Sequence, residues 1–176
     1  MSTSKYDGAT INSLEKRIEN GIQFEVSNLL SVANAGGVGK WLFRTGNKKI
    51  VIDLRRITSN GDELTYQAFA NPTVSADGTA VTPISNRDGN SATLSEVTMF
   101  HTPTTTDNGN PIPAVYMPGA AGQGQRTVGQ FAQDGLVRIL QSNTDYLVTI
   151  TNNGSENPAN IELYLLWSEV NDPSKV

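Results

Sequence analysis

The sequence predicts one all-β domain, on the basis of its composition, the alternation of its apolar residues and a turn motif that occurs twice. Of 176 residues, 16 are Gly and 8 are Pro, and Thr, Asn and Ser are plentiful, as is typical of turn-rich β proteins. This length suits one domain with its own core. We expect about eight antiparallel strands in a β-sandwich, most simply a jelly roll. An immunoglobulin-like sandwich is the alternative, although its disulfide is missing because the chain has no Cys.

The repeated motif lies between Tyr66 and Gly119. Its first copy reads FANPTVSADGT from Phe69, and its second reads FHTPTTTDNGN from Phe100. The aromatic residue, the Pro and the Gly of one copy are each 31 positions from their equivalents in the other. Pro lacks an amide donor and interrupts sheet pairing, and Gly provides the positive φ of a tight turn. We therefore expect two equivalent corners of the sandwich.

The strands are expected in residues 21–170, between an N-terminal arm (1–20) and a C-terminal tail (171–176). In the arm, Thr10 could cap a short helix that has Ile11, Leu14 and Ile18 on one face. Residues 119–133, rich in Gly, Ala and Gln, are expected to form a long surface loop. The runs with strand character cover residues 22–32, 40–44, 50–54, 64–68, 93–100, 136–140, 146–150 and 161–167.

Two strands carry more specific expectations. In the last, Ile161, Leu163, Leu165 and Trp167 alternate with a half-apolar set, which predicts a strand covered on both faces. In the third, the alternation breaks at Arg55-Arg56, where we expect a bulge or the end of the strand.

Charge and composition exclude several classes of function. The net charge of −4 argues against a nucleic-acid partner, which normally requires a basic surface. No apolar run has the roughly 18 to 20 residues of a membrane helix. Residues 1–20 lack the apolar segment of a secretory signal. The absence of Cys excludes disulfides and thiolate chemistry. We therefore expect a soluble protein without a membrane partner.

No motif indicates an enzyme or a nucleotide site. His101 is the one His of the chain, and its position at a strand end favours a structural or surface role. No Gly-x-Ser-x-Gly nucleophile motif occurs. Lys40 follows a Gly-rich run, but Asn34 and Trp41 stand where a phosphate loop requires Gly and Ser or Thr. Gly122-Gln123-Gly124 lacks the third Gly of a dinucleotide site.

Other candidate groups are better explained as structural, so we expect no catalytic residue, no metal site and no cofactor. Asp77, Asp88 and Asp107 occupy Gly-containing loops without the spacing of a calcium loop. Glu63, Glu96 and Glu162 fit outward positions on strands, although a pair of carboxylates for glycoside hydrolysis stays open. Trp41 and Trp167 could form a sugar platform but fit a core better. The remaining pairs, Lys48-Lys49 and Arg55-Arg56, fit solvated positions or salt bridges at a protein interface.

The order of turns and strand ends across residues 40–169 resembles a group of small virion structural proteins of tailed bacteriophages. It includes Thr45-Gly46-Asn47, the two Pro-Thr corners, and the segment Ile139-Leu140-Gln141-Ser142-Asn143-Thr144-Asp145-Tyr146-Leu147 that precedes Thr151-Asn152-Asn153 and the final Leu166-Trp167-Ser168-Glu169. This pattern lacks an active-site signature and does not include the N-terminal arm.

The resemblance implies a head decoration, or cement, protein with a jelly-roll fold. Such a protein would bind the outside of the phage head, clamp neighbouring major capsid proteins and assemble in the host cytoplasm. The corners at 72–78 and 103–109, the 119–133 loop and the arm would supply its contacts, with a dimer or trimer as the expected oligomer. A tail or fibre adaptor that binds the host is the alternative, and a lectin-like carbohydrate-binding protein is a second one.

Overall fold

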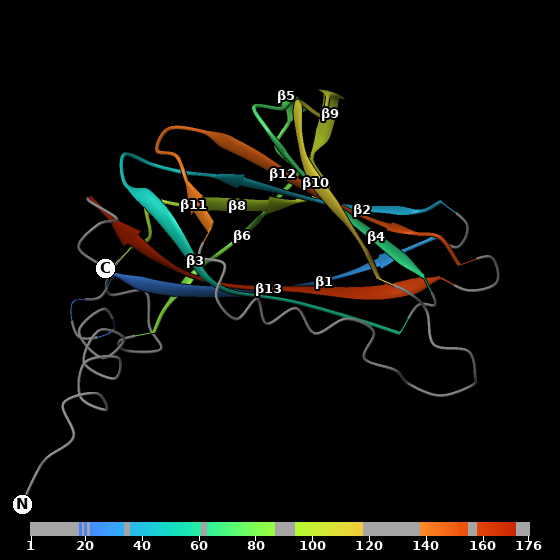
Figure 1. Cartoon of the computed structure of the whole chain (residues 1–176), viewed down its shortest axis with the longest axis horizontal. Helices are drawn as coiled ribbons and strands as arrows, with labels where there is room; N and C mark the ends of the chain where they lie inside the picture. The colour runs from blue at the N-terminus through green and yellow to red at the C-terminus, as the bar shows by residue number, and fades with distance from the viewer. Residues whose placement is uncertain are drawn as a thin grey trace, which may run out of the picture.

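Two antiparallel β-sheets packed face to face form the fold, which confirms the predicted all-β sandwich (Figure 1). The structure is a computed structural model that describes residues 18, 20, 22–33, 36–60, 63–86, 94–117, 138–154 and 158–171. Most of the predicted arm, the 119–133 loop, Asp88 and the tail after Asn171 lie outside these residues.

The described residues form thirteen strands rather than about eight, because four short strands within residues 73–107 and the longer strand Asn110–Met117 were not predicted. The five-stranded sheet has the order β11 (Arg138–Leu140), β3 (Lys49–Ser59), β13 (Ala159–Val170), β1 (Gln23–Val32) and β7 (Ile84–Ser85). The six-stranded sheet has the order β10 (Asn110–Met117), β4 (Leu64–Ala70), β12 (Asp145–Asn152), β2 (Val38–Arg44), β8 (Thr98–His101) and β6 (Thr79–Val81). A separate two-stranded ribbon pairs β5 (Thr73–Ala76) with β9 (Thr104–Asp107).

The main core lies between the two large sheets. The alternating Ile161, Leu163, Leu165 and Trp167 of β13 are all buried in it, as their spacing predicts. The Trp167 ring packs against Phe24 of β1, with centroids 6.1 Å apart, and edge-on against Phe43 of β2 at 5.3 Å. Aromatic contacts of this kind join strands from both sheets.

The outer face of β13 is covered only in part, since Glu162, Tyr164 and Leu166 are half-buried, and its polar groups are interconnected. The Tyr164 hydroxyl donates a hydrogen bond of 2.6 Å to Glu25 of β1. The guanidinium of Arg56 on β3 lies 4.7 Å from the centre of the Tyr164 ring. Burial, together with the bond to Glu25, raises the pKa of Tyr164 to about 12, because both disfavour the phenolate.

The irregularity expected at Arg55-Arg56 occurs earlier in β3, and the strand does not end there. Leu54 pairs with Leu166 and Ile52 with Trp167, so Asp53 is an additional residue in β3. After this bulge β3 remains paired to β13 as far as Ser59. The bulge places Arg55 opposite the inward-facing Leu165, with its guanidinium 4.3 Å from the centre of the Tyr66 ring. The pair is therefore not a simple solvated patch.

Candidate functional site

The two Trp residues considered for sugar binding are buried, and His101 contacts its neighbour in the chain. The side chains of Trp41 and Trp167 are 1% and 0% exposed, so neither offers a face to a sugar. The Trp41 indole donates a hydrogen bond to Asn28 at 2.8 Å. His101 ends β8, and its Nδ1 lies 2.8 Å from the Thr102 hydroxyl. The described residues contain no group of three or more His, Cys, Asp or Glu side chains suited to holding a metal ion.

A small cavity of about 70 Å³ lies between the two sheets. Apolar side chains such as Phe43, Val148 and Leu165 line most of it, and the arginines Arg55 and Arg138 also contribute. Its volume accommodates no more than a group of side-chain size, well below that of a typical ligand pocket.

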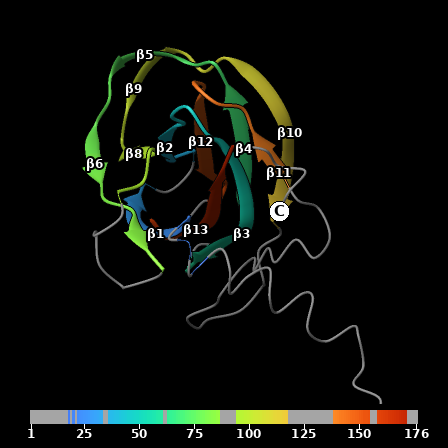
Figure 2. The ribbon, with the colours of Figure 1, turned by 90° about the vertical axis from the view of Figure 1, so that its left-hand side faces the viewer.

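The most distinctive feature is the ribbon made by the two copies of the repeated motif. β5 comes from the first copy and β9 from the second, and the two strands pair with each other. Thr73 pairs with Asp107 and Ala76 with Thr104, so exchanging the copies leaves the pairing unchanged. The ribbon crosses the outer face of the six-stranded sheet (Figure 2). The repeat was visible in the sequence, but the pairing of its two copies was not predicted.

The strands that lead to the ribbon are equivalent as well. β4 pairs with β12 just as β8 pairs with β2. On the outer sides, β10 pairs with β4 and β6 pairs with β8 in equivalent registers near the ribbon. The six-stranded sheet and the ribbon therefore share a local pseudo-two-fold axis, which passes between β12 and β2.

The backbone conformation just before each ribbon strand is nearly the same in the two copies of the motif. Asn71 and Thr102 both have φ of 58°. Each donates its amide to a carbonyl of a central strand at 2.8 Å, Asn71 to Asp145 and Thr102 to Lys40. A non-Gly residue at positive φ costs free energy unless its surroundings fix it. The hydrogen bond from each amide provides such a restraint.

The backbone conformation just after each ribbon strand is also the same in the two copies. Gly78 and Gly109 both have φ of 87°. A Cβ on Gly78 would overlap the carbonyl of His101, and one on Gly109 would overlap the carbonyl of Ala70. The repeated Gly is therefore required both for its φ and for the close approach of the two backbones.

Hydrogen bonds between hydroxyl groups and the backbone join the ribbon strands symmetrically. Ser75 donates to the carbonyl of Thr104 at 3.2 Å, and Thr106 donates to the carbonyl of Thr73 at 3.4 Å. These bonds, the two amide restraints and the tight turns make the ribbon a preorganised element.

The polar groups beneath the ribbon differ between the two halves. Arg44 of β2 forms salt bridges of 2.7 Å with Asp77 and 3.0 Å with Asp145. The bond to Asp77 and that to Asp145 raise the pKa of the guanidinium, although burial opposes this. In the other half, Lys40 donates to the Thr105 hydroxyl at 3.0 Å, and Thr105 donates to Asn108 at 3.0 Å.

A second apolar layer lies on the ribbon side of the six-stranded sheet. Leu42 of β2 and Leu147 of β12 pair directly across the sheet. Their neighbours Trp41 and Phe43 face the main core, so the alternation of a strand directs Leu42 to the opposite face. Both leucines are 0% exposed. The ribbon crosses this face of the sheet (Figure 2), and we infer that it contributes to the burial of the two leucines.

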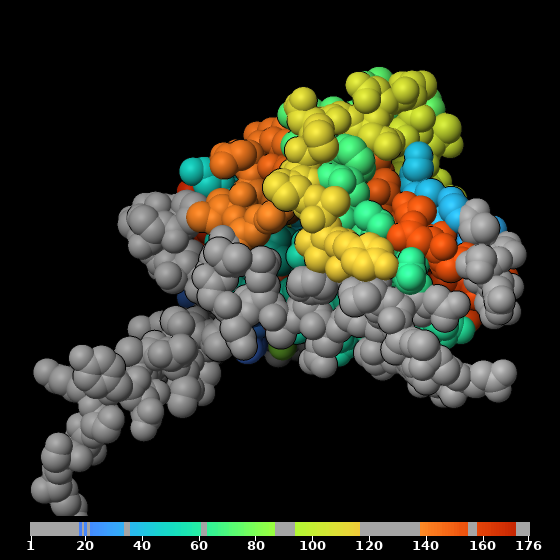
Figure 3. Space-filling model, turned by 45° about the vertical axis from the view of Figure 1, so that its right-hand side comes forward, coloured from blue at the N-terminus to red at the C-terminus, as the bar shows by residue number. Residues whose placement is uncertain are grey.

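The upper surface of the ribbon is exposed and polar, and it projects from the molecule (Figure 3). Its exposed side chains are small and, apart from Ala76 and Ala80, bear hydroxyl, carboxylate or amide groups: Asn71, Thr73, Ser75, Thr79, Thr102, Thr104, Thr106, Asp107 and Asn110. No Lys or Arg occurs in residues 71–81 or 102–110. This surface can accept hydrogen bonds or contact cationic groups, but it has no large apolar anchor.

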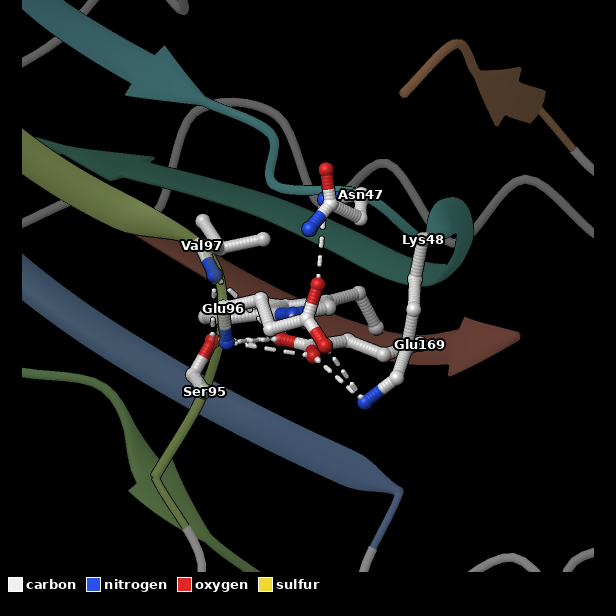
Figure 4. Close-up of polar contacts among 7 residues, drawn as sticks. Asn47, Lys48, Ser95, Glu96, Val97 and Glu169 are labelled. Atoms are coloured by element: carbon white, nitrogen blue, oxygen red, sulfur yellow. Dashed lines mark hydrogen bonds and ion pairs between the residues drawn. The ribbon is translucent and has the colours of Figure 1, made fainter. Parts of the chain in front are cut away.

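A buried carboxylate, that of Glu169, holds the segment just before β8 in place (Figure 4). Glu169 of β13, 2% exposed, accepts a hydrogen bond of 2.5 Å from the Ser95 hydroxyl and bonds of 3.0 and 3.1 Å from the Glu96 amide. Lys48 lies 3.8 Å from Glu169 and 2.9 Å from Glu96. The Lys48 ammonium lowers the pKa of Glu96 below its usual value. This network attaches the segment before β8 to β13, and sequence reasoning had placed Glu96 merely as an outward residue.

Comparisons with known proteins found no matching family model, no similar curated protein and no similar solved structure. Within the described residues, no helix is both long and apolar enough to cross a membrane. The ribbon is therefore the candidate site on structural grounds, as a binding surface.

Proposed function

We propose that this protein is a non-enzymatic virion structural protein of a tailed bacteriophage, and specifically a head decoration protein. The observation that carries a binding role is the preorganised, projecting β5–β9 ribbon, in which backbone hydrogen bonds and two tight turns fix the exposed polar surface. A surface that is already ordered loses little conformational entropy on binding. The assignment to a phage head comes from the sequence resemblance.

We propose further that the sandwich is a jelly roll with an inserted ribbon. The order β1, β2, β3, β4, β10, β11, β12, β13 can be numbered as strands one to eight. One sheet then has the order 1-8-3-6 and the other 2-7-4-5, an arrangement expected of two Greek keys in a double sheet. In the immunoglobulin-like alternative the first two strands share a sheet, whereas β1 and β2 lie in different sheets here.

In this proposal the partner is the major capsid protein, on the outer surface of the head. Many copies of a modest contact would stabilise the shell collectively through avidity. A homo-oligomer, a dimer or trimer, would increase that avidity. The protein would then require no catalytic residue, cofactor, nucleic acid or membrane, and assembly would take place in the host cytoplasm.

The first test is the copy number and position of the chain on purified particles, measured by quantitative gel analysis and electron microscopy. We expect hundreds of copies on the outer head and lower resistance to heat in heads that lack the protein. A few copies at the tail or a vertex would instead support the tail or fibre adaptor. Heads that are equally stable without the protein would contradict a cementing role.

A lectin-like role is the weaker alternative, because the two Trp residues that suggested a sugar platform are buried. A glycan array tests this role directly, and reproducible binding to one glycan class would support a lectin-like function.

A further inference from the structure

We infer that the ribbon contacts two copies of one partner chain, related by a local two-fold axis of the partner. This inference rests on the proposed function for the identity of the partner, the capsid protein. It adds a symmetry to the contact, a defined stoichiometry and the residues at which the two contacts are made.

The pseudo-symmetry of the ribbon extends to two pairs of its exposed residues. Thr73 and Thr104 occupy equivalent positions, are both exposed and begin the two paired strands. Ser75 and Thr106 are likewise equivalent, exposed and hydroxyl-bearing. A partner that meets Thr73 and Ser75 on one half finds hydroxyl groups at the equivalent positions of the other half, rotated by half a turn, whereas the exposed Ala76 has Asp107 as its equivalent.

The groups below the ribbon do not explain this equivalence of surface residues. One half is held by the Arg44–Asp77 salt bridge, and the other by Lys40 through the Thr105 hydroxyl. The charged groups beneath the ribbon therefore differ between its two halves. On the exposed side, by contrast, both halves carry Thr at the equivalent position. A contact shared by both halves would account for Thr at both equivalent positions.

The chemistry of the surface limits the partner. It has several hydroxyl oxygens and the exposed carboxylate of Asp107, whereas Asp77 is paired with Arg44, and residues 71–81 and 102–110 contain no Lys or Arg. It suits a partner that supplies Lys, Arg or backbone amide donors. A pair of loops related by a two-fold axis presents such donors twice, and binding both at once increases affinity through effective concentration. One chain would then bind two partner chains.

The closing experiment uses photo-crosslinking on assembled particles. A photoreactive amino acid is placed separately at Thr73, at Thr104 and, as a reference on the other sheet, at the exposed Ser31 of β1. Cross-linked peptides are identified by mass spectrometry. We expect positions 73 and 104 to capture the same peptide of the capsid protein. Capture of two unrelated peptides, or of this chain itself, would overturn the inference.

The result at position 31 distinguishes a failure of this inference from a failure of the proposed function. Capture of capsid protein from position 31 but not from 73 or 104 would leave a head protein in place and overturn the role of the ribbon. If the protein is absent from heads and none of the three positions captures capsid protein, both ideas are wrong.

A matched pair of variants measures the same symmetry by affinity. Thr73→Arg and Thr104→Arg each place a cation against the expected donors, and each should weaken binding to heads lacking the protein about 10-fold, the effect of one good contact. Ser31→Arg should leave the affinity unchanged, and thermal melts verify that all three variants fold. Unequal losses from the two Thr variants, or a loss from Ser31→Arg alone, would contradict a two-fold contact.

Discussion

At the scale of single residues, several polar side chains among the described residues bond across neighbouring strands. Tyr164 illustrates this, since its hydroxyl bonds Glu25 on the adjacent strand while Arg56 lies against its ring. Its raised pKa means that the folded protein favours the neutral phenol more strongly than the unfolded chain does. Protonation of Tyr164 is therefore linked to folding.

The sign of this linkage gives the first prediction. The stabilisation is fully present below pH 10, the ordinary pKa, and is lost as the pH rises toward about 12, the folded-state pKa. Urea unfolding between pH 8 and pH 12 should show a falling free energy of unfolding, and Tyr164→Phe should make that fall smaller. Tyr116 is 56% exposed, and desolvation and the neighbouring Glu63 raise its pKa as well, so Tyr116→Phe should also reduce the fall, but by less than Tyr164→Phe does. An identical pH profile for wild type and Tyr164→Phe would contradict the assignment.

The second prediction concerns the buried Glu169 carboxylate. Glu169→Gln keeps the size of the side chain but replaces an acceptor oxygen with an amide that faces donors from Ser95 and Glu96. We expect a loss of about 1–3 kcal/mol in the free energy of unfolding, typical of disrupted charge-assisted bonds. Glu96→Gln is the matched control on the same network. Because its salt bridge to Lys48 is partly exposed, it should cost less than about 1 kcal/mol. Denaturant titration at neutral pH compares them.

At the scale of elements, the two corners of the ribbon have the same backbone requirements. Gly78→Ala and Gly109→Ala each combine a positive φ of 87° with a Cβ that would overlap a neighbouring carbonyl. Each should lower the free energy of unfolding by about 2–4 kcal/mol, and by similar amounts. Gly36→Ala separates the two causes, because its φ of 86° is the same while a Cβ there meets nothing within 4 Å. It should cost only about 1–2 kcal/mol. Equal costs at all three positions would show that crowding contributes nothing.

The sequence predicted these corners because the repeated aromatic, Pro and Gly residues each have a local conformational effect. It did not predict that the two copies pair with each other, since a repeat defines local geometry but not a pairing partner. The Arg44–Asp77 salt bridge and the bonds between Ser95 and Glu169 join residues distant in sequence. No periodic pattern indicates such contacts. The alternation in β13 was easier to interpret because one face of a central strand lies wholly in the core.

At the scale of the whole molecule, the six-stranded sheet is apolar on both sides at its centre. Trp41 and Phe43 face the sandwich core, whereas Leu42 and Leu147 face the ribbon. A sheet covered on both faces couples the two layers energetically. We therefore expect the ribbon and the sandwich to unfold as one cooperative unit.

Leu147→Ala tests this coupling. The side chain is 0% exposed, so its truncation should cost about 2–5 kcal/mol in global stability, much as for a leucine of the main core. In wild type, the amides of Asn71 and Thr102 should exchange hydrogen nearly as slowly as those of β13, because opening the ribbon would expose Leu42 and Leu147 to water. In Leu147→Ala, protection of all three regions should fall by the same free energy. If the ribbon amides lose protection while those of β13 retain it, the ribbon opens independently of the sandwich.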